Sequence, residues 1–404
     1  MGVVLVLSSS DMLGTNYSFS PNATSSTAAL AHPKQGPSSD IEPQTQLQNP
    51  PKIINAIYLT SWAASNKKFV DYAIDLTANT EINAVVVDIK DYTGLVAYDT
   101  RIEAVNRYGT EEIRIPKINS LIKRFHDAGM YAIARVTVFQ DPALGEARPD
   151  LMVQSIQAAS STTDLKKRIW LDRKNLAWSD PASKEVWDYN ISIAKDAALR
   201  GFDEINFDYI RFPSDGNLKD MNFPFWKEEI PRSSVIKDFF AYLRSQLPDI
   251  KISADLFGLV TLAKNDLGIG QIIENAYLYF DFVAPMVYPS HYAPGSMGFA
   301  NPAEYPYEIV KNSIDSANQK LIAMKNAQTA KNGTSSPSAI SPLLLAKLRP
   351  WLQDFNLGAT YTADKVSVQI RATREVLGSD FVGYMLWNPS NKYTREAIGQ
   401  KIVE

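Results

Sequence analysis

Residues 201–213, Gly-Phe-Asp-Glu-Ile-Asn-Phe-Asp-Tyr-Ile-Arg-Phe-Pro, decide how the rest of the chain is interpreted. They predict a β-strand with two different faces, because side chains alternate from one face of a strand to the other. The apolar parity is expected to pack against helices, and the polar parity then faces a place that tolerates charge. In a parallel barrel this place is the lumen near the carboxyl ends of the strands. The apolar parity consists of Ile205, Phe207 and Tyr209, and the polar parity of Glu204, Asn206 and Asp208.

An edge strand with a solvated polar face is the simpler alternative for this stretch. The residues that follow argue against it, because Arg211 places a guanidinium shortly after Asp208 and Pro213 ends any strand pairing. Before the stretch, Asp180 and Pro181 predict the start of a helix, with an aspartate cap ahead of a proline. Asp208, at the end of the predicted strand, is therefore the first candidate for chemistry.

The composition is that of a soluble globular protein with a large core, with 404 residues of which 45% are hydrophobic and 21% charged. A net charge of −3 gives no reason to expect nucleic acid or an anionic membrane as a partner. The absence of cysteine excludes disulfides and thiolate metal sites. The histidines, His32, His126 and His291, are too scattered to form a multi-histidine metal centre. We predict neither a metal site nor a cofactor.

Residues 1–50 are predicted to be a disordered linker, because they are rich in Ser, Thr, Asn, Gln and Pro and lack apolar periodicity. The apolar run at residues 3–7 is too short to span a bilayer. A short apolar run followed by a polar linker resembles the end of a membrane anchor or export signal, and a disordered tail of a cytosolic protein is the alternative. The anchor interpretation predicts an extracellular or envelope location, with membrane tethering through the N-terminus.

From residue 51 to residue 404, strand and helix patterns alternate. Eight strands with intervening helices in one domain predict an α/β fold, a single (β/α)8 TIM barrel with enlarged βα loops. An open doubly wound sheet is the rival, but no glycine-rich phosphate loop follows any strand. We expect a monomer. The predicted strands are residues 53–62, 82–91, 131–140, 201–213, 251–259, 280–289, 348–355 and 382–388.

Two carboxylates at the ends of consecutive strands form the predicted catalytic pair. Neighbouring strands lie about 4.8 Å apart, so Asp208 and Asp255 could reach the separation of roughly 5 to 5.5 Å that a retaining glycosidase uses. Asp208 would attack the anomeric carbon, Asp255 would be the acid and base, and Arg211 or Arg135 would keep the nucleophile ionised. Asp255 could instead cap a loop or pair with Lys251 or Arg135.

Further polar and aromatic residues near strand ends are predicted to bind substrate, because every strand of a barrel points its carboxyl end at the same mouth. Asp88 could equally be a salt-bridge partner, and Trp387 could simply plug the barrel. His291, on a loop, is either a donor to a substrate hydroxyl or a solvated side chain. The predicted substrate-binding residues are Trp62, Asp88, Lys90, Asp91, Arg135, Trp178, Arg211, Tyr288, Trp387 and Asn388.

The segment 141–180 is too long for an ordinary βα loop and contains Trp170 and Trp178. We predict that it folds over the mouth, with one of these tryptophans as a wall of the substrate cleft. The alternative is that both tryptophans pack the segment onto its own helix.

Six segments together look like the putative glycosyl hydrolase domain family of bacterial envelope proteins, first catalogued as a domain of unknown function. The resemblance covers about residues 52–395. It implies similarity to TIM-barrel glycosidases of the α-amylase and α-galactosidase kind, in which a fourth-strand aspartate, here Asp208, is the nucleophile. The amylase kind has a glutamate acid on the fifth strand, where this chain has Asp255. The segments are AIYLT at 56–60, VVVDIKD at 85–91, ARVTVFQD at 134–141, FDEINFDYIRFP at 202–213, ADLFG at 254–258 and PMVYP at 285–289.

The residues and the resemblance together predict a glycoside hydrolase that acts on a cell-envelope or extracellular polysaccharide. A non-catalytic carbohydrate-binding barrel is the alternative from another functional class. Other glycan chemistry, such as that of a lyase or a transglycosylase, is a third possibility.

Overall fold

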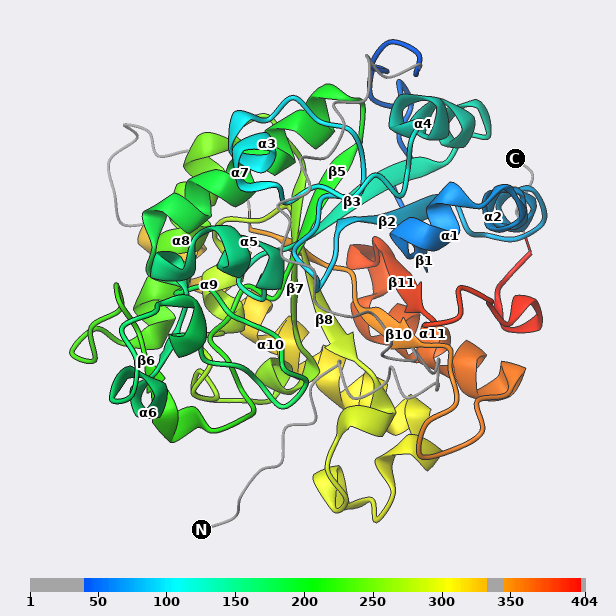
Figure 1. The fold of residues 1–404 in the computed structure, drawn as a ribbon. Coiled ribbons are helices and arrows are strands. Elements are labelled where there is room, and N and C mark those ends of the chain that lie inside the picture. The colour runs from blue at the N-terminus through cyan, green and yellow to red at the C-terminus, as the bar shows by residue number, and fades with distance from the viewer. Residues whose placement is uncertain (1–39, 333–344, 401–404) are drawn as a thin grey trace.

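Eight parallel strands close into a barrel in the computed structural model, which describes residues 40–332 and 345–400 (Figure 1). The order around the barrel is β1-β2-β3-β5-β7-β8-β10-β11, and β11 pairs with β1 to close it. The predicted (β/α)8 fold is thus confirmed. The strands are β1 (Ile54–Leu59), β2 (Ala84–Lys90), β3 (Tyr131–Thr137), β5 (Glu204–Asp208), β7 (Ile252–Phe257), β8 (Phe282–Val287), β10 (Trp351–Gln353) and β11 (Gly383–Trp387).

The seventh barrel position is split, whereas a single strand was predicted at residues 348–355. The short strand β9 (Lys347–Leu348) pairs with the start of β8, and β10 then pairs with the end of β8 and with β11. Pro350 stands between the two pieces and has no N–H to donate to a ladder. Because a proline inside a run of residues argues against a strand, the strand pattern of residues 348–355 was weak.

Helices surround the barrel, and their buried faces carry the apolar residues of a helical repeat. In α4 (Ile118–Asp127), for example, Leu121, Ile122 and Phe125 are buried. The other helices that separate the strands are α1 (Ser61–Ser65), α2 (Lys67–Asn79), α3 (Glu103–Tyr108), α7 (Lys184–Leu199), α8 (Arg232–Gln246), α9 (Ile273–Tyr277), α10 (Pro306–Asn332) and α11 (Ala363–Leu377).

The helix before β5 begins later than predicted. Ser183, not Asp180, caps α7, because its hydroxyl accepts the N–H of Val186. The buried Asp180 instead accepts the backbone N–H groups of Phe225 and Trp226, at 2.7 and 3.0 Å. Asp180 therefore connects the segment before α7 to the segment that follows β5.

The enlarged loop after β3 has secondary structure of its own. It contains α5 (Pro142–Ala147), β4 (Gln154–Ser155) and α6 (Ile156–Ala159). Strand β4 pairs antiparallel with β6 (Met221–Asn222), which lies in the loop after β5. Two long βα loops thus support each other on the same side of the barrel (Figure 1).

The polar parity of β5 faces the lumen, as predicted. Glu204 forms a fully buried ion pair with Arg349, and Tyr131 donates to the second oxygen of Glu204 at 3.3 Å. Asn206 donates to Ser253 and Asp255 on the neighbouring strand β7. The lumen is therefore lined by polar side chains as well as by aliphatic layers, although Asn206 Oδ1 and two nitrogens of Arg349 find no hydrogen-bond partner within the described residues.

Residues 40–50 are bound to the barrel, although the linker was predicted to extend to residue 50. The carboxylate of Asp40 accepts the N–H of Asn119 at the start of α4, at 2.6 Å. The N–H of Leu47 donates to Asp203 at 2.6 Å, and that of Gln44 to the carbonyl of Arg200. The predicted boundary at residue 51 is thus too late, and residues 1–39, with the predicted anchor or signal, lie outside the described residues.

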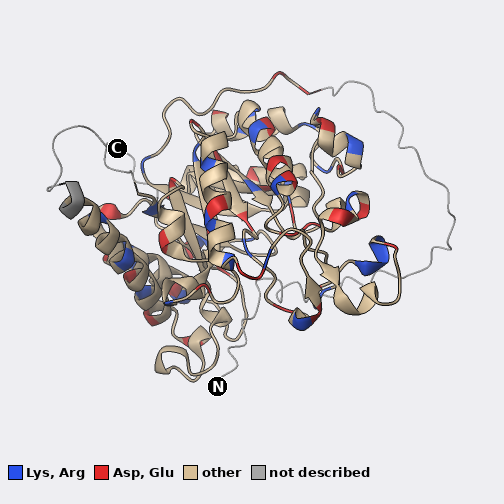
Figure 2. Ribbon diagram, turned by 90° about the vertical axis from the view of Figure 1, so that its left-hand side faces the viewer, with Lys and Arg blue, Asp and Glu red and all other residues tan. Residues whose placement is uncertain are grey.

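Acidic and basic side chains are both spread over the outer helices (Figure 2), and their numbers nearly balance, with a net charge of −3. In the residues that the structure describes, no helix has the length and apolar character needed to cross a membrane.

Substitution of Gly383, the first residue of β11, tests how closely β11 packs against β1. It has a φ of +113°, and a Cβ atom there would overlap the carbonyl oxygen of Ile54 on β1. We expect Gly383→Ala to lower the free energy of unfolding by more than about 2 kcal/mol, because the strained backbone and the steric clash both destabilise the folded state. Urea denaturation measures this loss.

The matched control is Gly129→Ala. Gly129 has a φ of +72°, but no atom lies within 4 Å of the place that a Cβ would occupy there. This variant should lose only about 1 kcal/mol. Equal losses in the two variants would show that β1 and β11 do not approach as described.

Candidate active site

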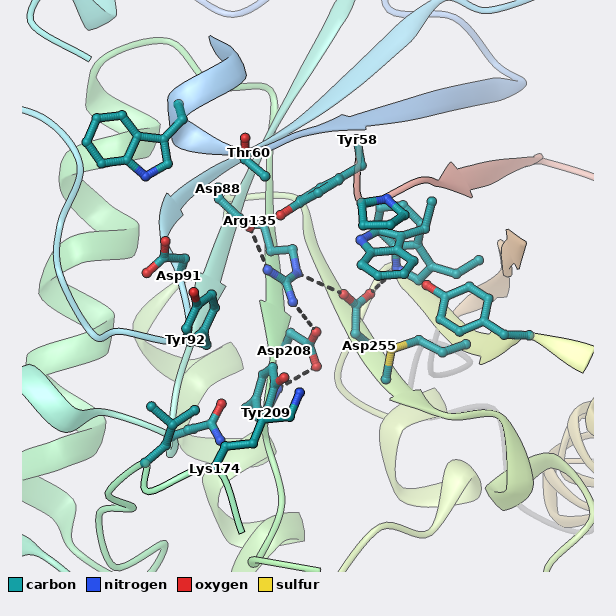
Figure 3. A pocket seen from close by; sticks show the side chains of 18 residues that line it. Tyr58, Thr60, Asp88, Asp91, Tyr92, Arg135, Lys174, Asp208, Tyr209 and Asp255 are labelled. Carbon is teal, nitrogen blue, oxygen red and sulfur yellow. Dashed lines mark hydrogen bonds and ion pairs between the residues drawn. The ribbon is translucent and has the colours of Figure 1, made fainter. Parts of the chain in front are cut away.

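A cavity of about 270 Å³ lies at the carboxyl ends of the barrel strands (Figure 3). Both predicted catalytic residues, Asp208 and Asp255, line it. Six of the predicted substrate-binding residues also line it, namely Trp62, Asp88, Asp91, Arg135, Tyr288 and Trp387. The strand ends therefore converge at one site, as the fold requires, whereas the roles of these residues remain predictions.

Arg135, on β3, is at the centre of the site (Figure 3). Its two terminal nitrogens contact Asp88 Oδ1 and Asp208 Oδ2, each at 2.5 Å, and its Nε lies 3.7 Å from Asp255 Oδ2. Burial alone would lower the pKa of the guanidinium, but the neighbouring carboxylates outweigh burial and raise that pKa. Arg135 is therefore a permanent cation shared by three carboxyl groups.

Asp208 is held in one orientation by donors to both of its oxygens. Besides Arg135 at Oδ2, the N–H of the next residue, Tyr209, donates to Oδ1 at 2.5 Å. This contact accompanies a sharp turn, since Tyr209 has a φ of +54°, an uncommon conformation for a bulky residue. The turn also moves the Tyr209 ring to the cavity wall, although strand parity predicted that it would pack against helices.

Asp255 has a different environment, with neutral donors only. Its Oδ1 accepts hydrogen bonds from Asn206 Nδ2 and Trp351 Nε1, both at 2.8 Å. Burial, and then the charge of Asp208, raise the pKa of the Asp255 carboxyl to about 8. This raised pKa favours the protonated form of Asp255, which is the form that a general acid requires.

The two other acidic residues of the cavity have cationic partners. Asp88 accepts from the hydroxyl of Tyr58 and from Arg135, and burial raises its pKa. Asp91 pairs with Arg114 at 2.6 Å. The salt-bridge interpretation of Asp88 is thus confirmed, and its contact with a substrate stays a prediction.

Aromatic rings form one wall of the cavity. Tyr288 and Trp387 stack with ring centroids 5.8 Å apart, and Tyr58 lies 6.2 Å from the same indole. Trp62, on α1, is 58% exposed, and the guanidinium of Arg114 lies 5.1 Å from its ring centroid. Since the cation covers one face of an indole that is more than half exposed, the other face is open to solvent.

Lys90 and Asn388 do not line the cavity, which corrects two predictions. Lys90 is fully buried, and its Nζ donates to the carbonyl of Thr137 and pairs with Asp141 at 2.8 Å. A register shift between Asp88 and Lys90 in the pairing of β2 with β3 breaks the strand alternation. Asn388 accepts the N–H of Ser390 in its own loop and donates to the carbonyl of Asp354 after β10.

Arg211 and Trp178 also lie away from the cavity wall, in contrast to the prediction. Arg211 is buried behind Tyr209, with its guanidinium 4.7 Å from the Trp178 ring and 4.4 Å from Phe257. Burial lowers the pKa of Arg211. Of the two predicted cations, Arg135 alone contacts Asp208.

The segment 141–180 borders the cavity, but through other residues than predicted. Lys174 and Leu176 line the cavity, whereas Trp170 and Trp178 are buried. Trp170 Nε1 donates to the carbonyl of Asn217 at 2.9 Å, and Trp178 Nε1 donates to Asp172 within the segment. Trp178 therefore bonds within the segment, whereas Trp170 ties the segment to the loop after β5, which neither the predicted cleft wall nor packing onto the segment's own helix describes.

His291 is half-buried rather than freely solvated, and its Nδ1 lies 3.0 Å from the hydroxyl oxygen of Ser290. It packs against the rings of Tyr288 and Phe355 and lies outside the cavity lining. Burial lowers the pKa of His291 to about 4. Within residues 40–332 and 345–400, no cluster of three or more His, Asp or Glu side chains is arranged to hold a metal ion.

Sequence reasoning missed several residues of the cavity. Tyr58 and Trp351 are the most informative, because each contacts one of the carboxyl groups at the centre. Tyr58 is one residue before the end of β1 at Leu59, a position that strand parity could have identified. Trp351 had no such signal, since its strand is split at Pro350. The other missed lining residues are Thr60, Tyr92, Gln140, Lys174, Leu176, Tyr209 and Pro389.

One family model and several solved structures are similar to this chain. The family model described as "Putative glycosyl hydrolase domain" matches residues 56–393. A hypothetical protein from Ruminiclostridium thermocellum ATCC 27405 is 38% identical over 53% of this chain and 98% of its own, with a TM-score of 0.44. The PgaB (BpsB) glycoside hydrolase domain from Bordetella bronchiseptica is 14% identical over 87% of this chain and 100% of its own, with a TM-score of 0.55.

The α-galactosidase TtGalA from Thermus thermophilus is 11% identical over 87% of this chain and 65% of its own, with a TM-score of 0.48. No curated protein matches the sequence. The likeness to the PgaB domain, at 14% identity, shows the fold alone.

Replacing Arg135 tests whether the three carboxyl groups depend on one cation. Arg135→Met should lower the free energy of unfolding by about 3 to 5 kcal/mol at pH 8, because it leaves buried carboxylates unpaired. The loss should be smaller at pH 5. Without the cation, the folded-state pKa values of the Asp88 and Asp255 carboxyls rise further above their unfolded values, so protonation at lower pH favours the folded variant. Denaturant titration at both pH values measures the difference.

Arg107→Met is the control, since Arg107 pairs with Glu103 on the surface and both are exposed. It should change the free energy of unfolding by less than about 0.5 kcal/mol at either pH. A loss in Arg135→Met that does not depend on pH would contradict the shared-cation description.

Proposed function

The chain belongs to the putative glycosyl hydrolase domain family, and from this premise we propose that it is a retaining glycoside hydrolase with Asp208 and Asp255 as its catalytic pair. One observation supports the proposal above all others. Two carboxyl groups contact the same guanidinium, and burial keeps Asp255 neutral beside the charge of Asp208. A glycosidase needs such a pair, one group to donate a proton and one to supply negative charge.

The proposed reaction has two steps. In the first, the Asp255 O–H bond breaks and its proton moves to the glycosidic oxygen as the bond from that oxygen to the anomeric carbon breaks. Asp208 forms a bond to the anomeric carbon in the same step. In the second step, Asp255 takes a proton from water, the water oxygen bonds to the anomeric carbon, and the Asp208 ester is released.

The aromatic wall supports a sugar substrate. Sugar rings have apolar faces that stack on aromatic side chains, and Tyr288 and Trp387 border the cavity that holds both carboxyl groups. Trp62 offers a second, exposed aromatic face at the mouth. We propose that the inner rings hold the sugar that is cleaved and that Trp62 contacts a neighbouring sugar of the same chain.

The proposed substrate is a polysaccharide of the cell envelope or the extracellular space, and the proposed working form is a monomer. The exposed Trp62 supports a chain substrate, because a single sugar in the cavity would leave this aromatic face unused. The envelope or extracellular location is part of the proposal and follows the resemblance to envelope proteins.

Asp208→Asn tests the proposed function. The change is isosteric and should lower the release of reducing ends from envelope polysaccharide preparations at least about 1,000-fold, because an amide is a poor nucleophile. Asp238→Asn, on the exposed face of α8, is the matched control and should retain wild-type activity. Full activity of Asp208→Asn would overturn the assignment. Glycan binding without hydrolysis, unchanged in this variant, would favour a carbohydrate-binding barrel instead.

The pH dependence of kcat/KM tests the role of Asp255. As the general acid, Asp255 must be protonated in the free enzyme, so kcat/KM should fall as pH rises through about 8. The decrease should approach tenfold per pH unit above that value. Circular dichroism at each pH separates this effect from unfolding. A constant kcat/KM up to pH 9.5 would exclude Asp255 as the acid.

A further inference from the structure

The two oxygens of Asp255 differ in their partners, and this difference has a chemical consequence. Oδ1 accepts two hydrogen bonds, from Trp351 Nε1 and Asn206 Nδ2. Oδ2 has no hydrogen bond within the part of the chain that the structure describes, and its nearest charged partner is Arg135 Nε at 3.7 Å. That distance is too long for a hydrogen bond. The carboxyl is therefore asymmetric before any substrate arrives.

An indole N–H can only donate, so the oxygen opposite Trp351 must serve as an acceptor. A carbonyl oxygen can accept two hydrogen bonds through its two lone pairs. A hydroxyl oxygen also carries a hydrogen, which needs an acceptor in addition to those two donors. With Trp351 and Asn206 both on Oδ1, that oxygen has the character of the carbonyl. The hydrogen of the neutral carboxyl then belongs to the other oxygen.

We propose that Trp351 is a positioning residue that, together with Asn206, places the acidic proton of Asp255 on Oδ2, the oxygen that faces Arg135 and Asp208. This inference rests on the proposed function and deepens it, because it states which oxygen delivers the proton. Arg135 and Asp208 both line the cavity, so the proton is on the side where a substrate would bind. Trp351 itself is buried and acts only through Asp255.

Packing makes this arrangement rigid. Trp351 is 2% exposed, its ring lies edge-on to Tyr58 at 6.4 Å, and its strand pairs with both β8 and β11. Asn206 is fully buried, and its amide nitrogen also donates to Ser253. Neither donor can turn away from Oδ1 without breaking the packing of the lumen.

The ionisable groups that face Asp255 come from three elements. They are Asp208 on β5, Arg135 on β3 and Tyr288 after β8. The charge of Asp208 opposes ionisation of Asp255, and Arg135 favours it, as do the hydrogen bonds from Trp351 and Asn206. Burial raises the pKa of the Tyr288 phenol well above its usual value, so Tyr288 stays neutral through the titration of Asp255.

The test is an NMR titration of the full chain and needs no substrate. Protein labelled with 13C at the aspartate carboxyls is titrated from pH 5 to 10, and Asp255→Asn identifies the Asp255 signal. The wild-type midpoint should lie near 8. Trp351→Phe keeps a ring but removes the donor, so the midpoint should rise by about one pH unit. Trp387→Phe, in the same cavity but without a bond to Asp255, should leave the midpoint unchanged.

Asn206→Leu locates the proton. If Asn206 donates to Oδ1, its removal destabilises the ionised form and the midpoint should rise, as in Trp351→Phe. If instead Oδ1 carries the proton and donates it to the Asn206 amide oxygen, removal of Asn206 destabilises the neutral form and the midpoint should fall. A fall in Asn206→Leu, or no change in Trp351→Phe, would overturn the proposal.

A measurement on the unmodified chain keeps the proposal testable if a variant does not fold. The indole N–H resonance of Trp351 should shift downfield as Asp255 ionises, with the same midpoint as the carboxyl signal. A Trp351 resonance that does not follow this titration would contradict the proposal.

The titration and the activity assays can fail separately. If the titration behaves as expected but Asp208→Asn is fully active, the proposed function is disproved. The inference that the Asp255 proton is on Oδ2 would still hold. Where the wild type cleaves a polysaccharide, Trp351→Phe should lower kcat with little change in KM and move the basic limb of the pH profile upward.

Discussion

Arg135 is the group on which the mouth of the barrel depends, because it is the cation shared by carboxyl groups from three other strands. One positive charge cannot balance three negative charges in a water-poor lumen, so the cluster favours protonation of at least one carboxyl. The hydrogen-bond partners of each carboxyl group decide which carboxyl is protonated. Asp208 has the guanidinium and a backbone N–H, whereas Asp255 has only neutral donors at hydrogen-bond distance. The division into one charged and one neutral group thus follows from the position of a single side chain.

Much of this arrangement could be predicted from the sequence, because alternation along a strand is a strong constraint. The polar parity of residues 204–208 placed Asp208 in the lumen, and the βα order placed Asp255 on the next strand of the barrel. Prediction failed where the alternation is interrupted. The register shift after Asp88 buries Lys90 against Asp141, and the turn at Tyr209 brings to the cavity a ring that parity assigned to the helix side.

Loops and aromatic residues were harder to predict, for a different physical reason. A tryptophan in a long loop can bury its ring under the loop or present it to a ligand, and the sequence pattern is the same in both cases. Trp170 and Trp178 are buried partly against the chain that follows β5, whereas Trp62, on the short helix α1, is exposed above Arg114. The distinction depends on contacts between segments far apart in the chain, which no local pattern contains.

The split seventh strand shows how a weak sequence signal can mark an important position. Pro350 cannot donate to a ladder, so the chain pairs with β8 before it and gains β11 as a partner after it. The residues on either side of Pro350 then contact different parts of the lumen. Arg349 forms an ion pair with Glu204 at the start of β5, and Trp351 donates a hydrogen bond to Asp255 near the end of β7. A continuous apolar strand would have been easier to recognise. It would also have left a buried glutamate without a cation and the acid without its indole donor.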